Sequence, residues 1–228
     1  MTILAVSEIF GPTLQGEGPS AGQLACFMRL GGCNLHCSWC DSGYTWDASN
    51  YDLREEITTY QMDEVIPMLL AIGTDRLVIT GGEPMLHQNP LVDLLREIGY
   101  AFPHVEMETN GTIMPDRILG LIERFNVSPK IDHSGNDKAD AIKSKALRAY
   151  ERAGNSIFKF VVSDPSDLIE VDRIVEDHGL TDVWLMPEGV SPQVLANRMD
   201  WICDAAIVRG WSVTSRLHIV AWGDERGR

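Results

Sequence analysis

The stretch Cys33-Asn34-Leu35-His36-Cys37-Ser38-Trp39-Cys40 carries three cysteines in a C-x₃-C-x₂-C pattern. Thiolate sulfur is a soft ligand for iron–sulfur clusters and for zinc, and three thiolates so close together can wrap one small inorganic centre. A structural zinc site takes four ligands, and a cubane cluster has four irons. Three cysteines would therefore leave one iron of a cluster without a protein ligand, and an open iron can bind a substrate or cofactor.

Alternative roles for the three cysteines fit the sequence less well. Buried cysteines that act as small hydrophobic residues are disfavoured, because Asn34, His36 and Ser38 break any apolar periodicity. A disulfide framework is disfavoured because the chain has five cysteines, an odd number, and is too long to need cross-links. A zinc site with His36 as the fourth ligand is the remaining competitor. The two other cysteines, Cys26 and Cys203, are expected to be core residues.

The composition favours a protein that acts on a small molecule. A chain of 228 residues is long enough for one domain with a substantial core. Its 33 acidic and 19 basic residues give a net charge of −14, which offers no electrostatic footprint for a nucleic acid. No apolar stretch approaches the ~20 residues that span a bilayer, and the first eight residues lack the basic region of a signal peptide. With free cysteines, these features predict a cytoplasmic protein without a membrane or nucleic-acid partner.

Short β-rich runs alternate with amphipathic segments, which indicates a parallel sheet covered by helices. Pro115 and Pro165 suit helix starts, whereas Pro129 interrupts a strand. The predicted strands are Ala25–Leu30, Arg76–Thr80, His104–Glu108, Val127–Ile131, Ile157–Val162, Asp182–Met186 and Val213–Ile219. The predicted helix faces comprise Met62, Val65, Ile66, Leu69 and Leu70; Ile118, Leu121, Ile122 and Phe125; and Leu195, Met199, Ile202 and Ala206.

Polar and glycine-rich clusters lie at the ends of several predicted strands. In parallel α/β folds, ligands bind at the carboxyl ends of the strands. Each cluster alone also marks an ordinary turn, but four clusters on successive strands would line one mouth together with the cysteine loop. The clusters are Thr80–Pro84, Glu108–Gly111, Ser128–Lys130 and Met186–Gly189.

The cysteine triplet, followed by Gly81-Gly82-Glu83-Pro84, resembles the radical S-adenosylmethionine (SAM) superfamily. Within that superfamily the chain is similar to the 7-carboxy-7-deazaguanine synthase family, from about Ser7 to Gly223. The matching segments are Leu14–Pro19, Phe27–Leu35, Cys40–Ser42, Glu108–Thr112, Ser128–Lys130, Lys159–Val162 and Leu217–His218.

The resemblance implies a single radical SAM domain over residues 1–228, built as an incomplete (β/α) barrel similar to a TIM barrel. Seven predicted strands are fewer than the eight of a complete barrel. The barrel would carry an N-terminal substrate loop at residues 7–24 and a cluster loop at residues 31–46.

The resemblance also implies an activity, the ring contraction of 6-carboxy-5,6,7,8-tetrahydropterin to 7-carboxy-7-deazaguanine with loss of ammonia. The product is a precursor of 7-deazapurines such as queuosine. The implied cofactors are a 4Fe–4S cluster, SAM and Mg²⁺. The implied partners are a reducing electron donor such as flavodoxin or ferredoxin and a second copy of the chain in a homodimer. Two alternatives remain from the sequence: a radical SAM activase of a glycyl-radical protein, and a non-catalytic iron–sulfur or zinc module.

Residue roles follow from the same resemblance. Trp39 would pack near the adenine of SAM, and the Gly81-Gly82 pair lets the main chain approach a ligand closely. The cluster ligands would be Cys33, Cys37 and Cys40. The SAM site would comprise Trp39, Cys40, Asp41, Gly81, Gly82, Glu83, Ser128, Pro129 and Lys130. The substrate site would comprise Leu14, Gln15, Gly16, Glu17, Arg29, Thr80, Glu108 and His218.

The chemistry of the substrate residues suits a pterin carboxylate. The amide of Gln15 and the carboxylate of Glu17 can form hydrogen bonds with the donor and acceptor edge of the pterin ring. The guanidinium of Arg29 can pair with a carboxylate through two nitrogens, and a charge within the apolar run around it needs a partner. His218 also suits a packing or capping role, and the sequence does not fix the role of Glu108.

Ser42 departs from the family pattern, in which threonine stands at this position and its hydroxyl coordinates Mg²⁺. Serine keeps the hydroxyl oxygen and loses a methyl group, so that coordination stays chemically available. The looser side-chain rotamer predicts a weaker site or a changed metal preference.

Overall fold

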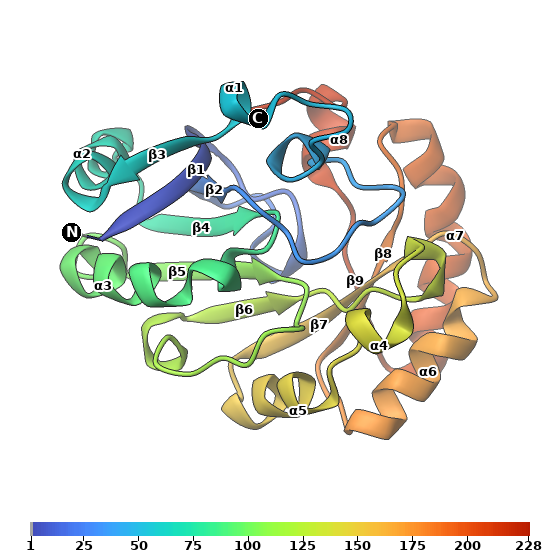
Figure 1. Ribbon diagram of the computed structural model, residues 1–228. Coiled ribbons are helices and arrows are strands. Elements are labelled where there is room, and N and C mark those ends of the chain that lie inside the picture. The colour runs from blue at the N-terminus through green and yellow to red at the C-terminus, as the bar shows by residue number, and fades with distance from the viewer. Residues whose placement is uncertain (1) are drawn as a thin grey trace.

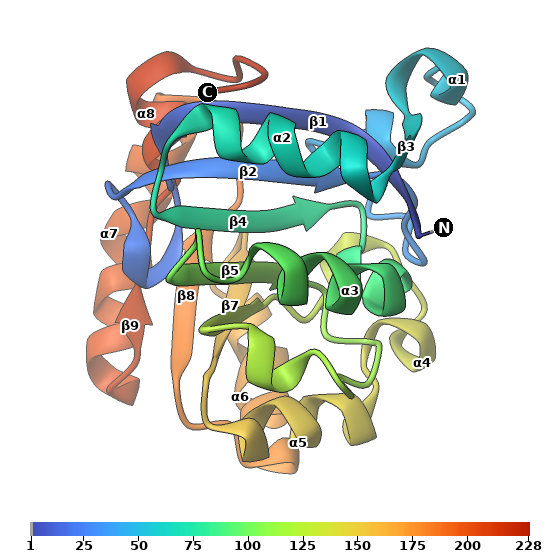
Figure 2. The same ribbon diagram turned by 90° about the vertical axis from the view of Figure 1, so that its left-hand side faces the viewer.

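The computed structural model describes residues 2–228. These residues contain a nine-stranded sheet in the order β3-β1-β2-β4-β5-β6-β7-β8-β9, which curls into an open barrel with helices along its outer face (Figures 1 and 2). The strands are β1 (Ile3–Leu14), β2 (Leu24–Leu30), β3 (Thr58–Gln61), β4 (Arg76–Gly81), β5 (His104–Thr109), β6 (Arg124–Val127), β7 (Ser156–Val162), β8 (Val183–Pro187) and β9 (Ser212–Val213). The helices are α1 (Leu53–Glu56), α2 (Met62–Ile72), α3 (Gln88–Ile98), α4 (Lys138–Ala141), α5 (Ser144–Ala153), α6 (Asp167–His178), α7 (Pro192–Arg209) and α8 (Leu217–Trp222).

The parallel part of the sheet confirms the predicted fold class, an α/β incomplete barrel. In the described residues, β2 and β4 to β9 pair in parallel, and each corresponds to one predicted strand. Strands β1 and β3 add an antiparallel edge that the sequence analysis did not predict. None of the helices described in residues 2–228 is long and apolar enough to cross a bilayer.

Two predicted strands have different bounds in the structure. The strand predicted at Val127–Ile131 is β6, which ends at Val127, because the chain leaves the sheet just before Pro129, a residue without an N–H to donate. The strand predicted at Val213–Ile219 shares only Val213 with the two-residue strand β9. Its last three residues, from Leu217 on, belong to α8, where the backbone N–H of Leu217 donates to the carbonyl of Gly16 and ties this segment to the N-terminal loop.

The helix predictions succeed where a long amphipathic pattern exists. Helices α2 and α7 are confirmed, with Leu69 and Ile202 buried, although Leu70 faces away from the core and is exposed. The helix predicted over Ile118–Phe125 is wrong, because Phe125 pairs in β6 and only a 3₁₀ turn precedes it. Pro115 begins no helix, and α6 begins two residues after Pro165.

Alternation along the strands separates an apolar outer face from a polar inner face. Met107 of β5 packs into the main core beneath the helices, whereas Glu106 and Glu108 on either side of it point into the barrel. Glu106 is fully buried and pairs with Arg76 and Asn126 toward the amino ends of the strands. Glu108 lies at the carboxyl end, where the site forms.

Candidate active site

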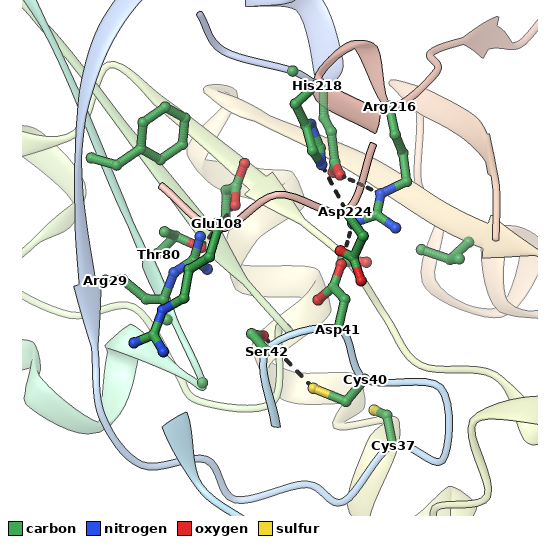
Figure 3. A pocket seen from close by; sticks show the side chains of 18 of the residues that line it. Arg29, Cys37, Cys40, Asp41, Ser42, Thr80, Glu108, Arg216, His218 and Asp224 are labelled. Atoms are coloured by element: carbon green, nitrogen blue, oxygen red, sulfur yellow. Dashed lines mark hydrogen bonds and ion pairs between the residues drawn. The ribbon is translucent and has the colours of Figure 1, made fainter. Parts of the chain in front are cut away.

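A cavity of about 500 Å³ opens at the carboxyl ends of the parallel strands, a volume suited to small ligands. The cysteine loop forms one wall of this cavity, and the N-terminal loop after β1 forms another. Figure 3 shows Arg29, Thr80 and Glu108 on one side and Asp41, Arg216 and His218 on the other, with the cysteines below them. Segments from both ends of the chain therefore face a single cavity.

The three cysteines of the triplet line the cavity together. Their sulfurs accept N–H donors from Leu35 on Cys33, from Asn136 on Cys37 and from Trp46 on Cys40. Burial raises the pKa of the Cys33 thiol to about 11 and also raises that of Cys37, so both cysteines are protonated at neutral pH unless a metal displaces the proton.

The zinc alternative receives no help from His36. Its imidazole is exposed and packs edge-on against Trp46, at 5.0 Å between ring centroids, instead of lining the cavity. In residues 2–228, no three His, Cys, Asp or Glu side chains come together in the way that a single metal ion requires.

The glycine pair lies where β4 meets the cysteine loop. The backbone N–H of Gly82 donates to Leu30, and that of Glu83 donates to Gly32. A β-carbon added to Gly82 would lie 2.2 Å from the carbonyl oxygen of Gly32, so only glycine fits between these two segments.

Glu83 lies beneath the cavity and braces it. Its carboxylate is fully buried and accepts hydrogen bonds from the backbone of Met85 and Asn110 and from the hydroxyl of Thr109. Burial raises its pKa, against the lowering effect of these donors. Among the residues assigned to SAM, Glu83 and Pro129 do not line the cavity; the lining residues are Trp39, Cys40, Asp41, Gly81, Gly82, Ser128 and Lys130.

All eight residues assigned to the substrate line the cavity, and three of them are joined by hydrogen bonds. The carboxylate of Glu108 accepts from Gln15 Nε2 at 3.2 Å and from Thr80 Oγ1 at 2.8 Å. Glu108, whose role the sequence leaves open, therefore ties the substrate loop to the end of β4. The eight residues are Leu14, Gln15, Gly16, Glu17, Arg29, Thr80, Glu108 and His218.

Glu17 is held between two cations. Lys159 of β7 pairs with one carboxylate oxygen, and Nε of Arg216 lies 3.1 Å from the other. Burial alone would raise the pKa of Glu17, but Lys159 and Arg216 outweigh it and hold the pKa far below its usual value. The Glu17 carboxylate is therefore charged and fixed in place before any ligand arrives.

Arg29 has the partner that its apolar surroundings require. Its Nε donates to Glu8 at 3.0 Å, and its guanidinium stacks near the rings of Phe10 and Tyr44. Its two terminal nitrogens make no hydrogen bond to any residue in 2–228, and the side chain lines the cavity. A fork of two such nitrogens matches a carboxylate.

His218 and Ser42 complete the wall. Burial lowers the pKa of His218, so its imidazole is neutral at pH 7, and it packs directly over Gly16. The hydroxyl of Ser42 faces the cavity and lies 3.7 Å from the sulfur of Cys40.

Two cations of the site were absent from the sequence predictions. Lys159 carried a usable signal, because a lysine inside the apolar strand of residues 157–162 needs a buried partner, just as Arg29 does. Arg216 carried none, since the contacts that bury it against Glu17, Asp41 and the carbonyl of Gly189 join distant segments.

Comparison with known proteins agrees with this geometry. The family model described as the radical SAM superfamily matches residues 29–156, so the chain belongs to that superfamily. It is 37% identical to the 7-carboxy-7-deazaguanine synthase of Pyrobaculum aerophilum, over 98% of this chain and 96% of the relative. The synthase of Bacillus cereus is 32% identical over the full length of both chains. Within the superfamily, the chain belongs to the 7-carboxy-7-deazaguanine synthase family.

Solved structures give the same assignment. The crystal structure of QueE from Escherichia coli superposes with a TM-score of 0.72 and 26% identity, and the match covers 96% of each chain. SuiB from Streptococcus suis, in its complex with SAM, matches at a TM-score of 0.55 and 12% identity, which is evidence for the fold alone.

Membership of the superfamily implies a 4Fe–4S cluster and SAM, and the site suits both. Three cavity-lining thiols with N–H donors match, in number and kind, the ligands of a cluster that keeps one iron open.

Proposed function

We propose that this chain is a 7-carboxy-7-deazaguanine synthase that contracts the ring of 6-carboxy-5,6,7,8-tetrahydropterin with loss of ammonia. The observation that carries the proposal is that the triplet Cys33, Cys37 and Cys40 shares one cavity with the preorganised polar loop Gln15–Glu17, in a chain of this family. A cavity of about 500 Å³ accommodates a bicyclic substrate beside a nucleoside cofactor.

The three cysteines would hold the 4Fe–4S cluster, which together with SAM supplies the radical chemistry. Trp39, Asp41 and the Gly81-Gly82 pair would shape the SAM site next to it. The remaining residues proposed for SAM are Cys40, Glu83, Ser128, Pro129 and Lys130, with Glu83 acting as a brace from beneath.

The substrate would be held at both of its ends. The terminal nitrogens of Arg29 would bind the substrate carboxylate, with Glu8 fixing the guanidinium from behind. Gln15 and the charged Glu17 would bind the pterin edge, with Glu108 and Arg216 holding them in position. Fixing polar groups before binding reduces the entropy cost of placing the substrate for reaction.

Ser42 would supply a hydroxyl oxygen to Mg²⁺, with substrate oxygens and water completing an octahedral shell. A reducing partner such as flavodoxin or ferredoxin would deliver the electron, and the chain would act as a cytoplasmic homodimer. The single domain would comprise residues 1–228, with residues 7–24 as the substrate loop and residues 31–46 as the cluster loop.

An anaerobic turnover assay tests the proposal. Reconstituted protein receives reductant, SAM, Mg²⁺ and 6-carboxytetrahydropterin, and mass spectrometry detects 7-carboxy-7-deazaguanine. Formation of 5′-deoxyadenosine without the product would retain radical SAM chemistry and reject this substrate. A protein with an intact cluster that forms neither compound would reject the enzymatic function.

A matched pair of cysteine variants tests the cluster assignment. Cys37→Ala should lose the iron and the brown colour, because one cluster ligand is gone. Cys203→Ala changes the same residue type outside the cavity and should keep both.

A further inference from the structure

Two side chains from outside the cysteine triplet donate N–H hydrogen bonds to its sulfurs, and the hydroxyl of Ser42 lies 3.7 Å from the sulfur of Cys40 as a further donor or acceptor. Trp46 Nε1 lies 3.3 Å from the sulfur of Cys40, and Asn136 Nδ2 lies 3.2 Å from that of Cys37. Among residues 2–228, the sulfur of Cys33 accepts only from a main-chain N–H, that of Leu35. The roles proposed above for binding SAM, substrate and Mg²⁺ include neither Trp46 nor Asn136.

The orientation of the Asn136 amide is fixed by its other contacts. Its Oδ1 accepts the backbone N–H of His36 at 2.8 Å, and its Nδ2 also donates to Ser134 Oγ at 3.1 Å. A flipped amide would place an N–H group against the N–H of His36 and an oxygen against the sulfur of Cys37. The backbone N–H of Ser38 also donates to the carbonyl of Ser134. The segment from Ser134 to Asn136 is therefore hydrogen-bonded to the cysteine loop at His36, Cys37 and Ser38.

Trp46 is held in a comparable way. Its ring packs edge-on against that of His36 with an interplanar angle of 88°, and its backbone N–H donates to the carbonyl of Gly43. The ring contact with His36 and the backbone hydrogen bond to Gly43 together orient the indole N–H of Trp46 toward the sulfur of Cys40.

We propose that Trp46 and Asn136 are positioning residues that hold two cluster thiolates and raise the reduction potential of the cluster. The inference rests on the proposed function, because it takes the three cysteines as the ligands. Hydrogen bonds to the sulfurs are among the factors that set iron–sulfur potentials. An N–H donor stabilises negative charge on sulfur, and reduction adds an electron to the cluster, so the reduced form gains more than the oxidised form. Loss of either donor should make the cluster harder to reduce.

The test compares two tryptophan variants of the reconstituted enzyme. Trp46→Phe removes an N–H that contacts sulfur. Trp39→Phe makes the same chemical change in the same loop, but the Trp39 N–H has no hydrogen-bond partner among the described residues. The readout is an electron paramagnetic resonance titration of the cluster without SAM. At a fixed potential, Trp46→Phe should give a several-fold lower ratio of reduced to oxidised cluster, while Trp39→Phe should match the wild type.

Asn136 is tested in two steps. Asn136→Leu removes the donor at similar size, and Asn136→Asp keeps an acceptor for the His36 N–H but places negative charge beside Cys37. Both variants should lower the ratio of reduced to oxidised cluster at a fixed potential, and Asn136→Asp should lower it more than Asn136→Leu. The double change Trp46→Phe with Asn136→Leu should lower it about tenfold, which corresponds to about 59 mV for a one-electron couple.

A label keeps the proposal testable if a variant does not fold. Protein grown with ¹⁵N-indole tryptophan should show a ¹⁵N hyperfine coupling to the reduced wild-type cluster, and the coupling should remain in Trp39→Phe. A wild-type cluster without this coupling, or intact Trp46→Phe and Asn136→Leu clusters with unchanged potentials, would overturn the inference and leave the proposed function standing. Iron retained by Cys37→Ala would instead reject the cluster assignment itself.

Discussion

The charged side chains of the cavity hold one another before a ligand binds. Glu17 lies between Lys159 and Arg216, and Arg216 also pairs with Asp41 of the cysteine loop. The cost of desolvating these groups is met by charge pairing, so removal of one partner leaves an uncompensated buried charge. The residues proposed to recognise the substrate are therefore also ones on which stability depends.

Glu17→Gln should lower the free energy of unfolding at pH 7 by about 3 kcal/mol, because it leaves Lys159 buried without its counter-ion. The folded-state pKa of Glu17 lies below the ordinary 4.5, so its stabilising effect is complete above pH 4.5 and is lost as the pH falls further. The variant should therefore lose less stability on acidification than the wild type. Urea unfolding of iron-free protein at pH 7 and below pH 4.5 measures both effects.

Glu188→Gln is the control for this prediction, because Glu188 pairs with Arg198 where both side chains are partly exposed. Its loss should cost less than about 1 kcal/mol. Equal losses in the two variants would contradict the special position assigned to Glu17.

Ser42→Ala should raise the Mg²⁺ concentration needed for half-maximal turnover, because it removes the hydroxyl that faces the cavity. Ser42→Thr restores the family's usual side chain and should lower that concentration relative to the wild type, since the added methyl restricts the rotamer. Turnover titrated with Mg²⁺ measures the effect, and iron content serves as the control. Identical titration curves for all three proteins would remove Ser42 from the metal site.

At the scale of the elements, strand ends and loops are joined by close backbone contacts. The end of β4 is hydrogen-bonded to Leu30 and Gly32, directly before the first cysteine of the triplet. This contact sets where the cysteine loop begins relative to the sheet, and it is possible only because Gly82 has no side chain.

Gly82→Ala should reduce the iron bound on reconstitution severalfold, because the added carbon would lie 2.2 Å from Gly32 O and 2.9 Å from the Cβ of Cys33. The secondary structure should remain, since the clash is confined to the loop. Circular dichroism and iron analysis test this. Gly120→Ala is the matched control, as nothing lies within 4 Å of its added carbon, and it should bind iron like the wild type. Full iron content in Gly82→Ala would show that the loop can shift without harm.

The seven parallel strands and two of the helices followed from periodicity, whereas the incomplete-barrel class was implied by the family resemblance. Short segments were less predictable. Residues 118–125 have helical spacing, but the parallel pairing of β6 with β5 takes Phe125 into the sheet. The antiparallel strand β1 was not predicted, and its pairing with β2 and β3 depends on segments that are distant in the chain.

For the whole molecule, the two ends of the chain meet at the substrate loop. The Gly18 N–H donates to Thr214 Oγ1 at 2.8 Å, the Leu217 N–H donates to the Gly16 carbonyl at 2.8 Å, and His218 covers Gly16. The cysteine sulfurs and their N–H donors all lie between residues 33 and 136. The segments proposed to hold the cluster and to cover the substrate are thus separate in sequence.

Truncation after Ser215 should therefore separate two activities. The protein should keep its iron and should still cleave SAM slowly to 5′-deoxyadenosine, but it should form no 7-carboxy-7-deazaguanine, because Arg216 and His218 are lost. Iron analysis and mass spectrometry measure the three quantities. Val220→Ala, at an exposed position of α8, is the control that should retain product formation. Product formation by the truncated chain would contradict the role given to this segment.

The sequence alone determined the cysteine triplet and the alternation of strands and helices, because each of these is a local pattern of residue types. The residues of the proposed substrate loop were implied by the family resemblance. Only the tertiary structure showed that Arg216 holds Glu17, that Glu108 joins Gln15 to Thr80, and that Asn136 reaches Cys37. These contacts link residues between 28 and 199 positions apart in the chain. The sheet brings such segments to one mouth, and no spacing along the sequence encodes which side chains meet there.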